Sequence, residues 1–286
     1  MSKAMTVISV QSHVSSGHVG NAAAVYPLRR LDHVVCPVHT TLLAHHPGHG
    51  ALRGEIVAPA SVRAVLDGLA AHGVFADCRA LLSGYLGSAE TGAAVADAWD
   101  AIRRARPDAL YCCMPVMGDA REGLYVTPDI PALFREVLVP RAGAVVANAF
   151  EAGVLSGIDV RDADTAAAAA AVIAAGGPDT VIVTSVPLDE DGLIGNVMLN
   201  GKEGHFFPVS EREIAAKGTG DFLAAVWLAI LLRGGDPAAA FGEALGVTQD
   251  AVARAQTAAL PELPIVETID DYCAHGLPEG AVPSRR

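Results

Sequence analysis

The chain has 286 residues, of which 51% are hydrophobic and 18% charged, so it can bury a sizeable core and is not intrinsically disordered. Its net charge of −12 argues against nonspecific binding to nucleic acid or to an anionic membrane surface. No secretion signal and no apolar run of about 20 residues is visible. The five cysteines show no CxxC spacing, which is typical of reduced thiols and predicts a cytoplasmic protein.

Short runs of apolar and β-branched residues alternate with alanine-rich stretches of helical periodicity. The first part of the chain predicts strands at 5–10, 34–38, 80–83 and 110–114, and helices at 21–31, 61–72 and 90–105. The second part predicts strands at 145–147 and 180–184, a strand–turn–strand unit over 192–208, and helices at 149–155, 165–175, 218–232 and 237–259. The last 14 or so residues are expected to hang loosely or to pack along the surface.

Repeated strand–helix units predict a mostly parallel sheet with helices on both faces, that is, a three-layer α/β/α fold. No internal repeat, linker or change of composition marks a boundary, so we expect one domain over residues 1–286. In open sheets of this kind, ligands bind beyond the carboxyl ends of the strands. The loops that follow strands are therefore the places to look for function.

Two such loops could contact a small ligand. The loop 11–21 after the first strand is small, polar and rich in glycine, so a ligand could approach its backbone, although a plain turn before a helix would look the same. The loop 83–88 carries Tyr85, which could form an aromatic wall for a flat ligand or simply pack at the edge of the core.

A third loop places an amide and a carboxylate at a helix start. Asn148 is well placed to cap the helix 149–155, and Glu151 lies in its first turn, where the helix dipole favours a negative charge. This structural role is sufficient by itself. The functional alternative is that Glu151 helps to hold Mg²⁺, directly or through water, because that ion prefers oxygen ligands.

The fourth segment, Gly218-Thr219-Gly220-Asp221, precedes a strongly apolar helix. Exposed amide groups at a helix start form an anion site, which would stabilise a phosphoryl group during transfer. Asp221 would then lie beside the acceptor as the base that takes up a proton. A simple capped helix is the alternative. The sequence contains neither a GxxxxGK[ST] motif nor a complete GxGxxG motif after the first strand, so other common nucleotide-binding folds are disfavoured.

Four histidines, at positions 39, 45, 46 and 49, lie close together in the sequence. Their spacing matches no usual zinc site. We interpret the segment as a substrate-lining loop in which His46 makes the contact.

Together these segments resemble the pyridoxal kinases of the ribokinase superfamily. The resemblance covers roughly residues 5–235 and is carried by motifs in the expected order. These motifs are Gln11-Ser12-His13-Val14 with Gly17-His18 and Gly20-Asn21, Pro27-Leu28-Arg29-Arg30-Leu31, Ser83-Gly84-Tyr85-Leu86-Gly87-Ser88, Pro115-Val116-Met117-Gly118, Asn148 with Glu151, and Gly218-Thr219-Gly220-Asp221.

The resemblance implies a ribokinase-like fold, a homodimer, and ATP-dependent phosphorylation of the 5′-hydroxyl of pyridoxal, with pyridoxine and pyridoxamine as further substrates. It implies Mg²⁺ and leaves room for a monovalent cation. Residue by residue, it assigns Asp221 as the base, Gly218, Thr219 and Gly220 as the anion hole, Ser12, Val19, His46 and Tyr85 as substrate contacts, and Asn148, Glu151 and Thr184 as residues on the ATP and Mg²⁺ side, with Glu151 at the metal.

The chain departs from the family pattern at four places. Met114 stands where the family usually has Asp, Ala147 where Pro is common, and Thr184 where a nucleotide-binding Lys is frequent. Residues 47–50 read Pro-Gly-His-Gly in place of a Thr-Gln-Tyr-Gly tract. Two alternatives therefore remain: a kinase for another hydroxymethyl heterocycle such as hydroxymethylpyrimidine, or a weakened relative that binds vitamin B6 compounds without turnover.

Overall fold

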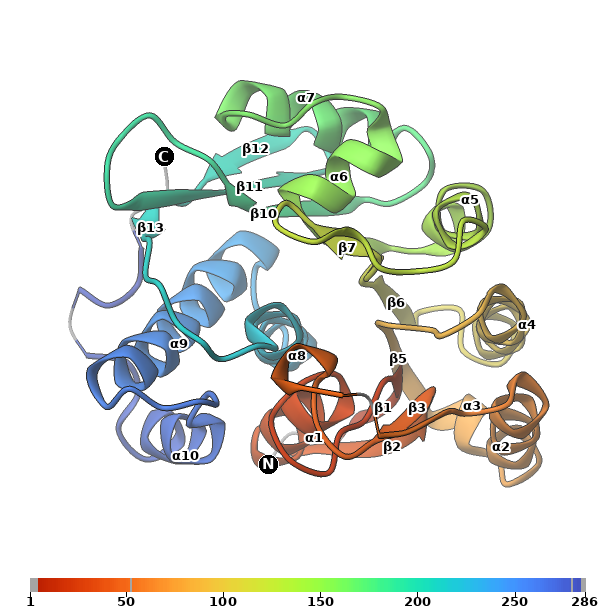
Figure 1. Cartoon of the computed structure of the whole chain (residues 1–286). Helices are drawn as coiled ribbons and strands as arrows, with labels where there is room; N and C mark the ends of the chain where they lie inside the picture. Colours follow the sequence, from red (N-terminus) through yellow and green to blue (C-terminus); the bar gives the residue numbers. More distant parts are fainter. Residues whose placement is uncertain (1–4, 52, 279, 284–286) are drawn as a thin grey trace.

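The fold is a three-layer α/β/α sandwich around one twisted sheet (Figure 1). The structure is a computed structural model that describes residues 5–51, 53–278 and 280–283. Within these residues the large sheet has nine strands in the order β12-β11-β10-β9-β6-β5-β1-β2, and β13 pairs with β11. Its strands are β1 (Met5–Gln11), β2 (His33–His39), β5 (Cys78–Ser83), β6 (Leu110–Cys113), β9 (Ala144–Asn148), β10 (Thr180–Val186), β11 (Leu193–Asn200), β12 (Glu203–Phe206) and β13 (Val209–Ser210).

Six adjacent strands, from β10 to β2 along the sheet, are parallel, whereas β11, β12 and β13 pair in antiparallel fashion at one side. All six parallel strands therefore end at the same edge, where the candidate ligand-binding loops emerge. The turn Asn200-Gly201 joins β11 to β12 as predicted, with Gly201 at φ 58°.

Alternate strand residues face two separate apolar layers. Val7, Leu82 and Val146 face the cluster that contains α1, α8, α9 and α10, while Ile8 and Leu81 face the cluster on the other side. The helices of the first layer are α1 (Asn21–Arg30), α8 (Thr219–Leu232), α9 (Pro237–Thr257) and α10 (Ile265–His275). Those of the second layer are α2 (Pro59–Ala71), α3 (Val74–Asp77), α4 (Ala89–Ala105), α6 (Ala149–Ser156) and α7 (Ala163–Ala174).

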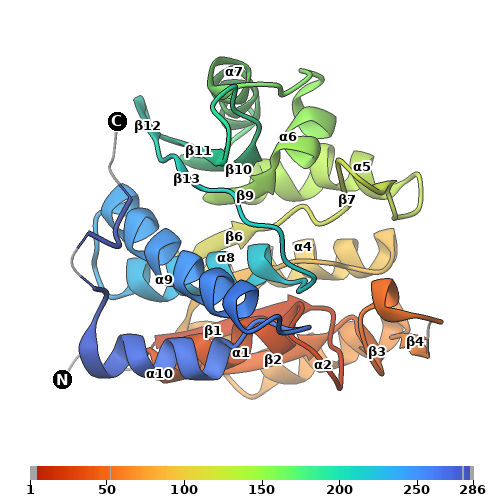
Figure 2. The ribbon, with the colours of Figure 1, turned by 60° about the vertical axis from the view of Figure 1, so that its left-hand side comes forward.

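Helix α8 is apolar on every side because it lies between the sheet and the helices α1 and α9 (Figure 2). Its residues from Phe222 to Ile230 are buried, and the Nε1–H group of Trp227 donates to the carbonyl oxygen of Pro237 at 3.1 Å. The first turn of this helix carries the Gly218–Asp221 segment, so the most buried helix of the molecule positions the candidate base.

The predicted fold class is confirmed, and the predicted strands and helices coincide with observed ones to within a few residues. Apolar residues spaced at three and four along α2 differ in burial: Val62 and Leu66 are buried, whereas Val65 is 48% exposed. The sequence patterns also gave no indication of α10, the hairpin of β3 (Thr41–Leu43) and β4 (Gly54–Ile56), the small hairpin of β7 (Gly118–Asp119) and β8 (Gly123–Leu124), and the helical turns α5 (Ile130–Leu133), η2 (Phe134–Leu138) and η3 (Val139–Arg141).

The described part of the C-terminal tail packs along the surface, which is the second of the two expected arrangements. Leu277 and Ala281 lie so close to Gly246 of α9 that a Cβ atom there would come within 2.7 Å and 2.9 Å of them. Within the described residues, no helix is both long enough and apolar enough to cross a membrane.

Candidate active site

The loop after β1 meets the start of α8 at the edge of the sheet. The N–H group of Gly20 donates a hydrogen bond to Oδ2 of Asp221 at 2.7 Å. Ser12 lies in the same place, since a Cβ atom on Gly20 would come within 2.4 Å of the Ser12 Oγ atom. Two residues that the sequence assigns to substrate binding and catalysis, Ser12 and Asp221, are thus brought together through Gly20.

The start of α8 can be formed only by glycine at position 218. Gly218 has φ 87° and ψ 8°, in the left-handed region. A Cβ atom there would lie 1.8 Å from the carbonyl oxygen of His18 and 3.2 Å from Cα of Val19. The first hydrogen bond of α8 runs from the Phe222 N–H group to the Gly218 oxygen, so the preceding N–H groups at the helix start point away from the helix, free to bind an anion.

Asp221 has a mixed environment that suits a base. Its side chain is partly exposed at the surface but is densely surrounded by protein atoms, and this burial raises its pKa to about 6, against the hydrogen bond from Gly20, which lowers it. A carboxylate with such a pKa is mostly ionised near neutral pH and yet accepts a proton more readily than an ordinary aspartate.

Glu151 lies across from Asp221 in the first turn of α6. Its Oε2 atom accepts from the Asn148 N–H group at 2.9 Å and its Oε1 atom from the Met117 N–H group at 3.2 Å, while the Asn148 Oδ1 atom accepts from the Glu151 N–H group at 2.9 Å. This is a complete capping box, so the structural role expected for Asn148 is confirmed. The Asn148 Nδ2 atom also donates to the Gly118 oxygen at 2.9 Å, which holds β7 against α6.

Burial raises the pKa of Glu151 to about 8, the hydrogen bonds from Asn148 and Met117 oppose this rise, and the nearby negative charge of Asp221 adds to it. Glu151 is only 5% exposed. A buried carboxylate whose charge is not balanced by a nearby positive charge is suited to bind a cation. Among the described residues, no group of three or more His, Cys, Asp or Glu side chains is arranged to hold a metal ion by itself.

This arrangement fits Mg²⁺ better than a metal that needs a full set of protein ligands. Mg²⁺ usually keeps several waters and is held by one or two carboxylates together with substrate phosphates. Glu151 supplies one such carboxylate at the edge of the sheet. Asp119 lies on the same side, but its Oδ1 atom already accepts from the N–H groups of Arg121 and Glu122 at 2.8 Å and 2.7 Å, which forms the turn between β7 and β8.

The small hairpin of β7 and β8 approaches the segment that precedes α8. Lys217 Nζ lies 3.6 Å from Oε1 of Glu122, and Arg121 lies 3.8 Å from Glu213. Both pairs are exposed and contribute little to stability. Tyr125, just after the hairpin, is 45% exposed, yet its pKa is raised by partial desolvation of its hydroxyl and then by the negative charges of Glu151 and Asp221.

The positions that the resemblance links to the nucleotide lie in different surroundings. Thr184 is the last residue of β10 that pairs with β9, where it lies opposite Asn148, and its Oγ1 atom donates to the Ala147 oxygen at 3.4 Å. Met114 is 4% exposed and packs in the apolar cluster of α8, so the position of the usual aspartate has become part of the core. Ser185, next to Thr184, has φ 57° and is exposed, which bends the end of β10 outward.

The other substrate-side residues follow β1, β2 and β5. Val19 is buried beside Val14 and Leu43, and Tyr85 is half-buried, with its carbonyl oxygen accepting from Thr40 Oγ1 at 2.6 Å. The Nδ1 atom of His46 accepts from the Gly48 N–H group at 3.0 Å, so this ring starts the short turn η1 (Pro47–His49). Its expected contact with substrate stays a prediction.

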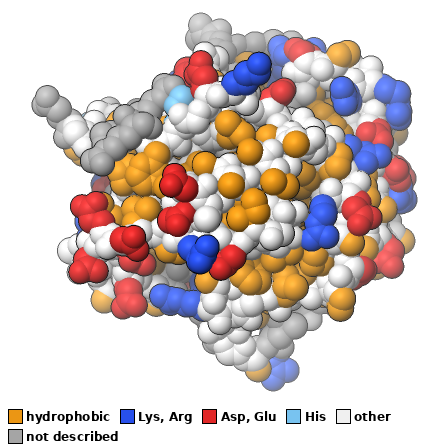
Figure 3. All heavy atoms as spheres, turned by 90° about the horizontal axis from the view of Figure 1, so that it is seen from above, with side chains coloured by type: hydrophobic (Ala, Val, Ile, Leu, Met, Phe, Trp, Pro, Cys, Tyr) orange, Lys and Arg blue, Asp and Glu red, His pale blue; other side chains and the backbone are white. Residues whose placement is uncertain are grey.

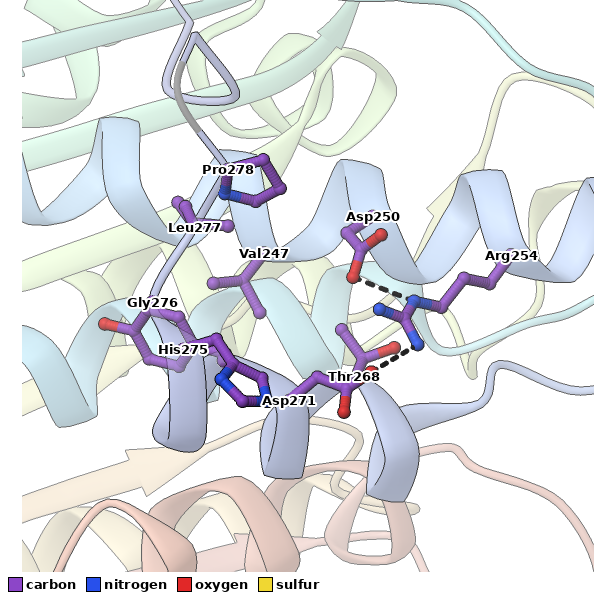
Figure 4. A pocket seen from close by; sticks show the side chains of 10 residues that line it. Val247, Asp250, Arg254, Thr268, Asp271, His275, Gly276, Leu277 and Pro278 are labelled. Atoms are coloured by element: carbon purple, nitrogen blue, oxygen red, sulfur yellow. Dashed lines mark hydrogen bonds and ion pairs between the residues drawn. The ribbon is translucent and has the colours of Figure 1, made fainter.

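A separate pocket of about 240 Å³ lies far from these residues, between α9 and α10 (Figure 4). Arg254 spans it, with Nε 2.9 Å from Asp250 and Nη1 2.7 Å from Asp271. None of the predicted site residues lines this pocket, and both of its aspartates are paired with Arg254. The edge of the sheet, and not this pocket, is the candidate active site.

Unpaired N–H groups at a helix start, an adjacent carboxylate with a raised pKa and a second, buried carboxylate, on a sheet of this topology, are the features expected of a small-molecule kinase. The family model described as phosphomethylpyrimidine kinase matches residues 31–263. Pyridoxal kinase PdxY of Corynebacterium diphtheriae is 39% identical over 266 residues, which cover 92% of this chain and 94% of the relative. Pyridoxal kinase PdxY of Rubrobacter xylanophilus is 40% identical over 253 residues, covering 87% and 85%.

Among solved structures, the pyridoxal kinase of Leishmania donovani in complex with ADP and pyridoxamine superimposes with a TM-score of 0.89 at 29% identity and covers 98% of both chains. The chain therefore belongs to the pyridoxal kinase family. The resemblance inferred from its motifs is confirmed, and so is the enzyme class, a kinase with ATP as co-substrate.

Several residues of the site were not assigned a role from the sequence. Gly20 was seen only as part of a motif, yet it donates the hydrogen bond to Asp221. Tyr125 and the β7–β8 hairpin gave no signal because two-residue strands have no periodicity to detect. Glu262, which contacts the loop after β1, is distant in sequence and could be found only in three dimensions.

The two glycines of the α8 start should respond differently to alanine. Gly218→Ala forces a Cβ atom into the His18 carbonyl oxygen at a left-handed backbone, so we expect a loss of stability of about 2 kcal/mol or more together with a loss of activity. A Cβ atom on Gly220 would meet no other atom within 4 Å, and this residue has no positive φ, so Gly220→Ala should keep the stability or raise it slightly.

The measurements are urea unfolding and turnover on the same preparations. Gly220→Ala should lose activity, because the added methyl group would narrow the open space at the start of α8 where we expect the anion to bind. An active, stable Gly220→Ala variant would contradict the anion site, and a stable Gly218→Ala variant would contradict the close packing against His18.

Proposed function

We propose that this kinase transfers the γ-phosphoryl group of ATP to the 5′-hydroxyl of pyridoxal, and that Asp221 is the base. One observation carries the assignment of the base: the Asp221 carboxylate is held by Gly20 at the first turn of α8, beside the N–H groups that favour an anion. The hydroxyl that loses its proton to Asp221 would attack the phosphorus atom, and the N–H groups of Gly218–Gly220 would stabilise the charge on the transferred group.

The proposal places the acceptor over β1, β2 and β5 and the nucleotide over β9 and β10. On the acceptor side it uses Ser12, Val19, His46 and Tyr85. On the nucleotide side it uses Asn148, Glu151 and Thr184 with the α8 start, and Glu151 would hold Mg²⁺ through water or directly. Bound Mg²⁺ would neutralise phosphate charge. Asn148 acts by orienting Glu151 and β7, because its side chain is already engaged with both. A monovalent cation remains a further proposal.

One other class of compound is a candidate acceptor. The matched family model is described as phosphomethylpyrimidine kinase, and the tract at 47–50 departs from the pyridoxal kinase pattern. A hydroxymethylpyrimidine is therefore the second candidate acceptor. Both are flat heterocycles with a hydroxymethyl group, so the same base and anion site would serve either.

An assay of the purified protein with ATP and Mg²⁺ tests this function. The acceptors are pyridoxal, pyridoxine, pyridoxamine and hydroxymethylpyrimidine, and we expect pyridoxal to have the highest kcat/KM. Asp221→Asn should lower kcat by about two orders of magnitude or more while pyridoxal still binds, because the amide cannot take the proton.

The wild-type kcat/KM should also fall as the pH drops below about 6, since protonated Asp221 cannot act as a base. If hydroxymethylpyrimidine is the only acceptor that is phosphorylated, the proposed acceptor is wrong, while the proposed base stands. Unchanged turnover by Asp221→Asn would show that Asp221 is not the base. Binding of pyridoxal by the wild type without any turnover would favour the weakened-relative alternative.

We further propose that Mg²⁺ binding with nucleotide releases a proton from Glu151. The pKa of Glu151 is about 8 in the free protein, so at pH 7 a cation must displace a proton to gain the carboxylate. The affinity for the Mg²⁺–ADP pair should then rise from pH 6.5 toward a plateau above about 8, by at most about tenfold per pH unit.

Calorimetry in two buffers of different ionisation enthalpy measures the released proton. Glu151→Gln keeps the size of the side chain and serves as the matched control, because any proton released by the nucleotide itself remains in that variant. Equal proton release by wild type and Glu151→Gln would show that Glu151 does not titrate on binding.

We propose a homodimer formed through the outer face of α7. This face carries Ala167, Ala168, Ala171 and Val172, all exposed, and Val172 is 48% exposed. Figure 3 views the molecule from this side and shows apolar side chains in the middle of the face with charged side chains of both signs around them. Such a patch favours association with a second copy.

Sedimentation should give a dimer for the wild type and a monomer for Val172→Glu. Val266→Glu is the matched control, because Val266 is 40% exposed on α10, in the other helical layer. A dimer that persists in Val172→Glu would place the interface elsewhere, and a monomeric wild type would refute the dimer.

Two broader expectations also remain proposals. One domain over residues 1–286 is supported by the single large sheet, whose strands come from residues 5–210 and whose helices extend to residue 275. A cytoplasmic location is supported by five cysteines that form no disulfide, three of them buried.

A further inference from the structure

The connection between α9 and α10 brings a carboxylate to the loop after β1 (Figure 2). The Oε2 atom of Glu262 accepts a hydrogen bond from the His18 N–H group at 3.2 Å. Its Oε1 atom lies so close to Gly17 that a Cβ atom there would come within 2.6 Å of it. The Glu262 carboxylate therefore lies along the backbone of Gly17 and His18.

The other side of the same loop rests on the catalytic helix. The His18 carbonyl oxygen contacts Gly218, and two residues further on the Gly20 N–H group donates to Asp221 at 2.7 Å. The stretch 17–20 thus contacts two carboxylates, Glu262 at His18 and Asp221 at Gly20. It needs holding, because Gly17 and Gly20 both have positive φ and have no side chain to fix them.

Glu262 is itself held firmly. It lies between Pro261 and Leu263 in the sequence Pro-Glu-Leu-Pro, and the proline rings restrict the backbone. Leu263 is fully buried in the same apolar cluster as α8. A rigid segment anchored beside the catalytic helix presents this carboxylate to the loop.

We infer that Glu262 is a positioning residue for phosphoryl transfer, which keeps the Gly20 N–H group on Asp221 by holding the backbone of His18. The inference rests on the proposed role of Asp221 as the base. In this role Glu262 acts on the base through the loop backbone that it contacts at His18. It ties the end of the α9 layer to the first loop of the sheet, across 244 residues of sequence.

The direction in which the pKa of Asp221 moves distinguishes this positioning role from a direct electrostatic effect of the Glu262 charge. The Gly20 hydrogen bond lowers the pKa of Asp221, so a loop that has come loose should raise it. Removing the negative charge of Glu262 by itself would have the opposite effect on a nearby carboxylate, because it removes repulsion. The titratable groups that face Asp221, Glu151 on α6 and Tyr125 after β8, stay unchanged in every variant below.

The test compares Glu262→Ala, Glu262→Gln and Glu267→Ala with the wild type in the full-length protein. Each is assayed with saturating ATP and Mg²⁺ over a range of pH from about 5 to 8, at constant ionic strength. This range spans the acid limb of the pH profile, that is, the fall in kcat/KM at low pH that protonation of Asp221 would cause. Glu267 is an exposed carboxylate in the first turn of α10 and is the matched control. The histidines of the loop, His13 and His18, are present throughout.

Glu262→Ala should lower kcat/KM for the acceptor by about tenfold or more and move the acid limb to higher pH. Glu262→Gln keeps an oxygen acceptor for the His18 N–H group and should stay close to the wild type in both respects. Glu267→Ala should not differ from the wild type. Thermal melting shows the folded fraction of each variant, and Glu262→Asp, which shortens the side chain by one methylene, replaces Glu262→Ala if the latter does not fold.

A loss of activity in proportion to the folded fraction, with an unmoved acid limb, would overturn the inference, because it would describe a purely structural residue. An acid limb that moves to lower pH, or a Glu262→Gln variant as impaired as Glu262→Ala, would also overturn it. The Asp221→Asn variant is measured beside these. If it keeps wild-type turnover, the proposed base fails by itself, whereas a dead Asp221→Asn with a normal Glu262→Ala refutes only the role of Glu262.

Discussion

The hydrogen bond from the Gly20 N–H group to the Asp221 carboxylate is the contact on which the site depends. It joins the first loop of the sheet to the first turn of the most buried helix, and it forms only because two glycines allow the backbones to meet. Gly218 accommodates the His18 oxygen where any side chain would collide, and Gly20 turns the loop with φ 55°. The Asp221 carboxylate is thereby fixed relative to the free N–H groups of α8, which is the geometry that the proposed phosphoryl transfer requires.

The chemistry of the site follows from a balance between burial and hydrogen bonds at two carboxylates. Asp221 receives one backbone hydrogen bond and keeps a pKa of about 6, whereas Glu151 receives hydrogen bonds from Asn148 and Met117 and still has a pKa of about 8. The difference follows from the deeper burial of Glu151 and from the charge of Asp221 beside it. In the proposed mechanism, the same environment prepares Asp221 to accept a proton from a hydroxyl and Glu151 to exchange a proton for a cation.

Local signals in the sequence predicted much of this architecture. Alternating strands and helices indicated the parallel sheet, Asn148 indicated its helix cap, and Asn200-Gly201 indicated the hairpin. Most of the motifs that carry the family resemblance lay in the loops at the correct edge of the sheet, whereas Pro27-Leu28-Arg29-Arg30-Leu31 forms the end of α1. What the sequence could not predict were contacts between distant segments: Gly20 and Asp221 are 201 residues apart, and His18 and Glu262 are 244 residues apart. Val65 shows the same limit, since its spacing suits a buried face but its side chain is exposed.

The replacement of the usual aspartate by Met114 acquires a physical meaning in this setting. Its side chain packs in the apolar cluster of α8, so the site loses a negative charge without gaining a buried polar group that lacks a partner. A carboxylate at this buried position would need a hydrogen-bond donor or a cation to offset its desolvation. With Met114 in place, Glu151 is the one carboxylate among the residues that the family resemblance assigns to the nucleotide side. In the proposed mechanism, the substitution therefore bears on metal and nucleotide binding, while Asp221, held by Gly20, is left as the family pattern has it.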